Sequence, residues 1–393
     1  MSIPIRRDTI KSTTSVYFWQ AGFRPFFLGA GLYGALFMAV FYGMYFGKIA
    51  GRWPVAVTAM HAHEMVYGYG LAVVAGFLLT AVRNWTRMQT ADGRLLMVMS
   101  GAWVAGRLPL LLPQVAYLGA VGDVLFGGLL LLSVAMPLYR RQLYGQWPVV
   151  LIVLVLWWLH VVYYLSLMGL TTLAPMQVVR ISLYVLLNLL FIFSRRLIPT
   201  FIGAGLGQAG QLRNRRWVDR LLIPLFLVYA VNELFIGQIQ LTSYLAFILL
   251  VGNGIRLWDW YRPGIWRKHL LWSLYVGYLF LTMGFALRLY AAYDGADPRL
   301  ALHAMTVGGL GLISVSMMAR VSLGHSGLSV FEERPGLGWI FTGVVLSAIF
   351  RALVPAIDAS LYLNALPVAM WLWVAAFLGF VALYVKIFFQ NNR

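Results

Sequence analysis

The chain has 393 residues, enough for two or three soluble domains, but its composition excludes that organisation. Apolar residues make up 61% of the chain and charged residues only 11%, and a water-soluble fold cannot bury so large an apolar share. The net charge of +18 would suggest nucleic acid if it lay on one face of a soluble domain. The basic residues lie instead between apolar runs, as in loops that face an anionic cytoplasmic leaflet. The sequence therefore predicts an integral membrane protein that does not bind nucleic acid.

The chain contains no cysteine, which limits its metal and redox chemistry. Disulfides, cysteine-ligated zinc, iron–sulfur clusters, thiolate-bound haem and covalently attached haem are excluded. Any metal must be held by histidine, methionine, carboxylate or tyrosine side chains.

Residues 1–24 form a basic segment without the pattern of a cleaved signal peptide, and apolar runs follow from about 25 to 388. Each run has roughly 18–25 residues, the length that crosses the hydrocarbon of a bilayer. We predict an all-α polytopic membrane protein with about 12 transmembrane helices in one bundle, a single membrane domain over residues 1–393. Because arginine and lysine concentrate in alternate loops, both termini are predicted to be cytoplasmic. The predicted spans are 25–47, 61–82, 94–112, 114–137, 148–169, 176–198, 217–236, 239–258, 270–291, 300–321, 338–356 and 361–388.

The second predicted span opens with two histidines and a carboxylate, His61, His63 and Glu64. Residues two apart on a helix point about 200° apart, so both histidines cannot ligate one metal from a regular helix. Either the helix begins at about residue 62 and His61 lies on an irregular lead-in, or only one of the two histidines is a ligand.

Later spans add further ionisable residues, and each is a functional candidate because charge is costly in lipid. His160 lies about halfway through span 148–169, where it is either a metal ligand or a histidine that hydrogen-bonds between helices. Glu64 and Glu233 are candidate proton carriers, metal ligands or arginine partners. Cations near the predicted outer ends are Arg180, Arg288 and Arg351.

The tenth predicted span repeats a pattern of the second. His63 and His303 each begin the sequence His-x-Met-x-x-Gly at the same predicted membrane depth. Opposed imidazoles on two apolar helices suit haem iron, and also copper or zinc, so we predict these two as a ligand pair. The arginines above would pair with haem propionates. The alternative is that the histidines only hydrogen-bond across helices. At the inner end of the span, His325, with Arg320 nearby, either caps the helix or binds a second group.

Longer motifs around these residues resemble one known family, the NnrS family. The motifs run from residue 22 to 327, and the single departure that we note is the charged Arg83 before Asn84. They are Gly22-Phe23-Arg24-Pro25-Phe26-Phe27, His61-Ala62-His63-Glu64-Met65, Ala75-Gly76-Phe77-Leu78-Leu79-Thr80-Ala81, Asn84-Trp85-Thr86, Arg196-Leu197-Ile198-Pro199-Thr200-Phe201, His303-Ala304-Met305-Thr306-Val307-Gly308 and Met318-Ala319-Arg320-Val321-Ser322-Leu323-Gly324-His325-Ser326-Gly327.

The resemblance implies a twelve-helix protein of the bacterial inner membrane that contains haem and also copper, linked to denitrification and to resistance against nitric oxide. The family's motif histidines fall here on His61, His63, His303 and His325. The pairing of His63 with His303 is our inference from the residues, not a property carried over from the family.

The function expected from these features is binding and removal of nitric oxide at one b-type haem, by reduction to nitrous oxide. Five histidines lie in or near the predicted spans, too few for a second haem together with a three-histidine iron, so one haem and one extra metal near Glu64 fit better. Glu64 or Glu233 would deliver protons, and a quinol or a redox protein would supply electrons. The alternative is a non-enzymatic sensor of nitric oxide, or a carrier of haem, metal or a small solute.

Overall fold

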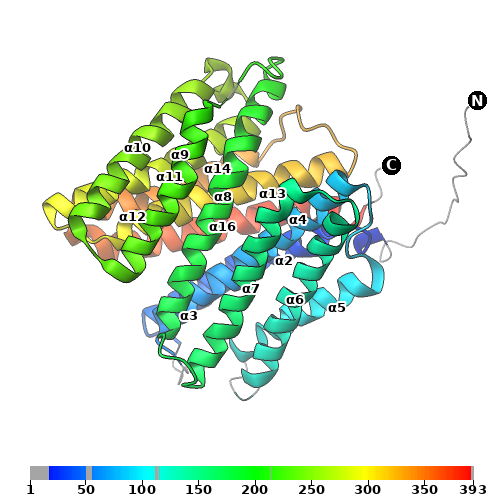
Figure 1. Ribbon diagram of the computed structural model, residues 1–393, viewed down its shortest axis with the longest axis horizontal. Helices are drawn as coiled ribbons and strands as arrows, with labels where there is room; N and C mark the ends of the chain where they lie inside the picture. Colours follow the sequence, from blue (N-terminus) through cyan, green and yellow to red (C-terminus); the bar gives the residue numbers. More distant parts are fainter. Residues whose placement is uncertain (1–16, 50–54, 111–113, 115, 213, 391–393) are drawn as a thin grey trace, which may run out of the picture.

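The computed structural model describes residues 17–49, 55–110, 114, 116–212 and 214–390, so the basic residues Arg6, Arg7 and Lys11 lie outside the described part (Figure 1). Within that part the regular structure is helical, with no strand. The α-helices are α2 (Phe23–Tyr45), α3 (Val57–His63), α4 (Leu71–Thr86), α5 (Gly93–Ala105), α6 (Ala116–Arg140), α7 (Trp147–Leu167), α8 (Pro175–Gly205), α9 (Arg216–Val231), α10 (Ile239–Trp260), α11 (His269–Asp294), α12 (Arg299–His303), α13 (Leu312–His325), α14 (Leu337–Ala348), α15 (Val354–Ile357) and α16 (Tyr362–Phe389).

The predicted membrane spans are confirmed as helices, with ends that differ by a few residues. Ten helical stretches in the described part are long and apolar enough to cross a membrane. Helices form there because lipid offers no partners for backbone N–H and C=O groups, which must be satisfied within each segment. Two predicted spans are not among the ten: α5 has only 13 residues, and α9 carries Arg216, Asp219 and Arg220 in its first turns. The count of twelve therefore stays a prediction.

Two apolar cores hold the bundle together. The first lies mainly among α2, α4, α6, α7, α14 and α16, and the second among α8, α9, α10 and α11. Phe77, Leu183 and Val321 pack against both cores. In Figure 1, α5 and α6 lie on one side of the bundle and α9 and α10 on the other, while α2 and α16, from opposite ends of the chain, pack together between them.

Four π-helical segments interrupt the described helices, and each lies at a candidate residue. The segment η1 (Glu64–Gly70) follows His63, and η7 (Ala304–Gly311) follows His303. The other two, η5 (Asn232–Ile236) and η8 (Ile349–Leu353), contain Glu233 and Arg351. A π segment adds a residue to the helix and changes which side chains face a neighbour, and such segments are frequent at functional sites. The two His-x-Met-x-x-Gly stretches that begin at His63 and His303 thus also have the same π-helical backbone conformation.

Candidate metal centre

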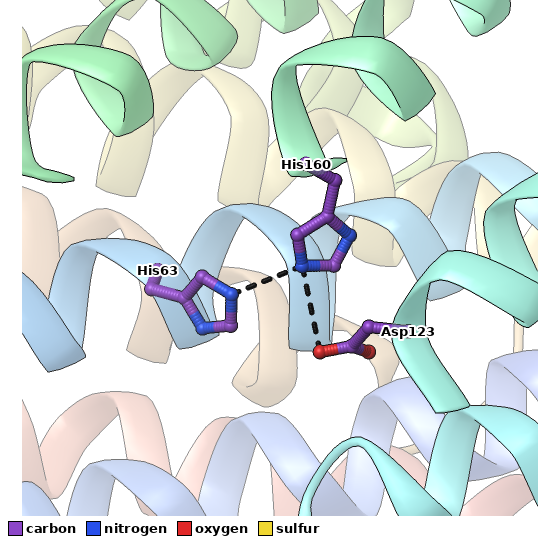
Figure 2. A group of neighbouring side chains, drawn as sticks. All are labelled: His63, Asp123 and His160. Carbon is purple, nitrogen blue, oxygen red and sulfur yellow. Dashed lines mark hydrogen bonds and ion pairs between the residues drawn. The ribbon is translucent and has the colours of Figure 1, made fainter. Parts of the chain in front are cut away.

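Three buried side chains from three separate helices point toward one another in the first core (Figure 2). The two histidine Nε2 atoms, of His63 at the end of α3 and His160 on α7, lie 3.0 Å apart. Asp123 on α6 places its Oδ2 3.4 Å from His160 Nε2. One possible ligand atom from each residue lies within 4.8 Å of the others, so together they could hold a single metal ion.

The His63 ring is oriented by a second carboxylate. Glu64, the first residue of η1, accepts a hydrogen bond from His63 Nδ1 at 2.9 Å. Tyr33 on α2 donates its hydroxyl to the other oxygen of Glu64 at 2.5 Å. With its proton held at Nδ1, neutral His63 presents the Nε2 lone pair toward His160. Metal-binding histidines are commonly oriented in this way by a carboxylate.

Asp123 is held from the opposite side by an arginine and a tyrosine. Arg107, just beyond α5, pairs with Asp123 Oδ1 at 2.5 Å and with Glu64 Oε2 at 3.3 Å. Tyr164 on α7 donates to Asp123 Oδ2 at 2.5 Å. With neutral histidines, two carboxylates and one guanidinium leave one net negative charge in a buried site. That balance favours a bound cation or a proton on a histidine.

Aromatic rings enclose the two imidazoles. Tyr67 stacks on the His160 ring with centroids 3.6 Å apart, and Tyr163 stacks on His63 at 4.3 Å. The Tyr67 hydroxyl lies 2.6 Å from Ser182 Oγ on α8, which fixes the ring against His160. Packing on both rings limits their movement, as expected of a preorganised site.

Two glycines leave room for the charged groups. A Cβ atom added at Gly68 would lie 2.8 Å from Arg107 Nη1 and from Glu64 Oε2. A Cβ atom added at Gly106 would overlap the Asp123 carboxylate. The helices approach closely at both positions because glycine has no side chain, which lets the ionic groups of α5, α6 and η1 meet.

The family described as NnrS protein matches residues 17–392, nearly the whole chain. The chain belongs to the NnrS family. A search among curated proteins found no match. Membership of the NnrS family supports a haem-related role in nitric oxide metabolism or resistance for this multi-pass membrane protein.

The centre of this NnrS protein fits a small metal ion and does not fit a haem held between His63 and His160. Imidazole nitrogens bind a metal at about 2.0–2.1 Å, so two axial ligands on opposite faces of a haem are about 4 Å apart. The 3.0 Å between His63 Nε2 and His160 Nε2 suits neighbouring ligands on one ion instead. Two histidines and a carboxylate are a donor set used by zinc and by non-haem iron.

The two histidines of the predicted pair, His63 and His303, have different hydrogen-bond partners in the structure. His63 Nε2 faces His160, whereas His303 Nε2 accepts a hydrogen bond from Arg351 Nη2 at 2.9 Å. His61 lies near His303 and Arg351, since it interacts electrostatically with both. Helix α3 begins at Val57, so an irregular lead-in at His61 is excluded. His61 and His63 point in different directions from this helix, as expected for residues two apart, and they contact different neighbours.

The donors of this second group, His61 and His303, have the chemistry that haem requires. His303 donates its Nδ1 proton to the Arg299 carbonyl at 2.8 Å, so its Nε2 carries the lone pair. Arg351 binds this lone pair in the structure, and a metal would have to take the place of that hydrogen bond. His61 stacks on Phe41 at 4.1 Å, and its buried Nδ1 has no hydrogen-bond partner among the described residues. Arg351 likewise keeps one buried guanidinium nitrogen without a partner there, as an anion-binding group would.

The other predicted site residues lie apart from the metal centre. Glu233 binds Arg288 at 2.9 Å and accepts a hydrogen bond from Thr242 at 3.0 Å, at the edge of the second core. Arg180 is exposed near the start of α8. His325, at the end of α13, contacts Asn84 at 3.4 Å and lies about 30 Å along the helix from His303. Arg320 stacks over Phe201 at 4.2 Å toward the same end.

Sequence reasoning missed Asp123 and Arg107, although both gave a signal. Each is an ionisable residue inside a predicted apolar span, 114–137 and 94–112. Such residues are functional candidates by default, but the sequence prediction concentrated on the ends of the spans and did not include these two. Tyr33 and Tyr164 gave no signal, because buried tyrosines are common in an aromatic-rich bundle.

Proposed function

We propose that this NnrS protein binds nitric oxide at the His63–His160–Asp123 centre in the bacterial inner membrane and reduces it to nitrous oxide. The observation that carries the proposal is the convergence of three metal-type donors in a buried site, where the side-chain charges leave one negative charge uncompensated. A bound redox-active ion such as iron or copper would supply a site for the diatomic ligand and a path for electrons.

The reaction needs protons, and the centre contains groups that can hold them. Two nitric oxide molecules, two electrons and two protons give one nitrous oxide and one water. Glu64 connects Tyr33 to His63 through hydrogen bonds of 2.5 and 2.9 Å, so this chain of groups can hold and pass a proton toward the buried imidazoles. Arg107 keeps both carboxylates in place while the proton moves. The electrons come from a membrane quinol or a redox protein.

A haem b, expected from the family, would be held by His61 and His303. Bound there, it would supply a second iron for electron transfer or for nitric oxide binding. The chain's own contribution is to orient His303 through the Arg299 carbonyl. Arg351, which donates to His303 Nε2 in the structure, would leave that nitrogen when haem binds and would pair with a propionate.

The test separates the two centres by metal content. We expect His63→Ala, His160→Ala and Asp123→Ala to lose the non-haem metal, measured by mass spectrometry of the purified protein, while haem absorbance stays. His303→Ala and His61→Ala should lose haem absorbance and keep the other metal. His269→Ala is the matched control, because this partly exposed histidine lies next to Glu333 and away from both groups.

Turnover decides between enzyme and sensor. Wild-type protein in proteoliposomes with a quinol should consume nitric oxide at an electrode and release nitrous oxide, and the Asp123→Ala variant should lose at least tenfold of that rate. Wild-type protein that binds nitric oxide spectroscopically without consuming it would favour the non-enzymatic sensor. A wild-type protein free of metal would overturn the proposal.

A further inference from the structure

An apolar cavity of about 80 Å³ lies between α4 and α8, where the two cores meet. Its described lining contains no charged side chain, and its polar side chains are Tyr69, Ser194 and Ser314. Tyr69 and Ser314 hydrogen-bond to each other at 2.5 Å, which reduces their affinity for water. A cavity of this lining favours small apolar molecules over water.

The cavity opens toward the lipid on one side and approaches the metal centre on the other. Val73, Phe77, Leu190 and Phe193 line it and are only partly buried, although they lie on helices within the membrane spans. These four side chains are a partly exposed part of the lining, and we assign them to a mouth of the cavity that faces hydrocarbon. A molecule dissolved in the bilayer therefore has direct access to the cavity.

Gly70 and Leu186 line the cavity on the two elements, η1 and α8, that also carry Tyr67 and Ser182, so we assign them to its inner end. Leu186 lies one turn after Ser182 on α8, and Gly70 lies three residues after Tyr67 in η1. Tyr67 and Ser182 are the hydrogen-bonded pair whose aromatic ring covers His160 at 3.6 Å. The Tyr67 ring and its Ser182 partner thus lie close along the chain to these lining residues and cover the imidazole of the centre.

We infer that this cavity is the entry route by which a small uncharged molecule, here nitric oxide, reaches the metal centre sideways from the lipid, with Tyr67 as the gate. The inference rests on the proposed function, because it supplies the substrate of that centre. Nitric oxide is apolar and diatomic, so it dissolves in hydrocarbon and fits the volume. Ions are excluded by the apolar lining, and a quinone ring or a haem is too large for 80 Å³.

Gly70 controls the width of the inner end. A Cβ atom at this position would lie 2.9 Å from Leu186 Cδ2 and 3.1 Å from the Met65 carbonyl oxygen. Because the first neighbour is the tip of a flexible side chain, Gly70→Ala is expected to push Leu186 into the cavity without breaking the helix. Leu186→Trp should fill the same end with an indole.

Two measurements test the route. Xenon bound to the purified wild-type protein, detected by xenon NMR, should occupy the cavity and be displaced in Leu186→Trp. In stopped-flow experiments, nitric oxide association with the metal centre should slow at least tenfold in Leu186→Trp and severalfold in Gly70→Ala, with metal content unchanged. Leu154→Trp is the matched control, because Leu154 is 39% exposed on the lipid face of α7 and its variant should behave as wild type.

The outcomes distinguish failure of the entry route from failure of the proposed function. Xenon that does not bind, or an association rate unchanged in both Leu186→Trp and Gly70→Ala, would overturn the route while leaving the metal centre intact. If Leu186→Trp does not fold, Gly70→Ala and xenon binding to wild type still decide the inference. Loss of the proposed function would show instead in the metal analysis, which does not involve the cavity.

Discussion

Asp123 shows how a single buried residue can determine both the stability and the metal binding of this protein. Its side chain is fully buried at 0% exposure, in a span where a lone carboxylate would be costly. Arg107 offsets that cost for Asp123 and Glu64 together, and Tyr164 and His160 complete the contacts of Asp123. The result is a buried ionic network in which two carboxylates share one guanidinium.

Removal of Arg107 is therefore expected to be severe. Arg107→Met should lower the free energy of unfolding by about 3–5 kcal/mol, because Asp123 and Glu64 would stay buried without their cation. Denaturant unfolding of the purified protein measures the change. The double variant Arg107→Met with Asp123→Asn should recover part of the loss, and no recovery would show that the charges are not coupled.

Glu64 tests the role of the proton-carrying group. Glu64→Gln keeps a carbonyl oxygen that can accept from His63 but cannot carry a proton, so metal content should be retained while nitric oxide consumption falls at least tenfold. Electrode measurements in proteoliposomes with a quinol give the rate. Glu233→Gln serves as the control, because Glu233 is bound to Arg288 at the other core, and equal effects of the two variants would refute the assignment.

At the scale of elements, the π segments set the direction in which key side chains point. In η1 the extra residue fixes the rotation between α3, which carries His63, and α4, which packs into the core. Removal of one residue would let this stretch return to i→i+4 bonding and would change the positions of the remaining η1 side chains around the helix axis. The contacts that Glu64, Tyr67 and Gly68 make with His63, His160 and Arg107 would then be disturbed.

For η1 we predict that a deletion can abolish metal binding while the helix content of the protein is kept. Deletion of Met65 within η1 should leave the circular dichroism of the purified protein almost unchanged and reduce its non-haem metal content at least tenfold. Deletion of Phe235 in η5, a residue with 57% exposure, is the matched control and should retain the metal. Equal metal loss in both deletions would mean that any shortened helix disturbs the centre.

At the scale of the whole molecule, the two apolar cores differ in what they contain. The first core contains the ionic network, and the second packs against it through α8, leaving the apolar cavity at their junction. The same arrangement places His61 and His303 at one end of the bundle and His325 at the other. Orientation in the membrane then decides which compartment each group faces.

Orientation can be measured directly because the natural chain has no cysteine. Tyr293→Cys, at a position with 86% exposure near the end of α11, should react with an impermeant maleimide in intact spheroplasts. Trp339→Cys, at a position with 84% exposure near the start of α14, should react only after the membrane is opened. The reverse pattern would place both termini outside.

The sequence by itself was sufficient for the helical membrane fold and the helix positions, because apolar runs of bilayer length have few alternatives in lipid. It also indicated His61, His63, His160, His303 and Glu64 as candidates, because ionisable residues in such runs are costly. Their partners depended on how helices distant in the sequence pack and on π segments that rotate side chains. Only the tertiary structure therefore gave His63 and His303 different partners, joined His63 to His160 and Asp123, and placed an apolar cavity beside them.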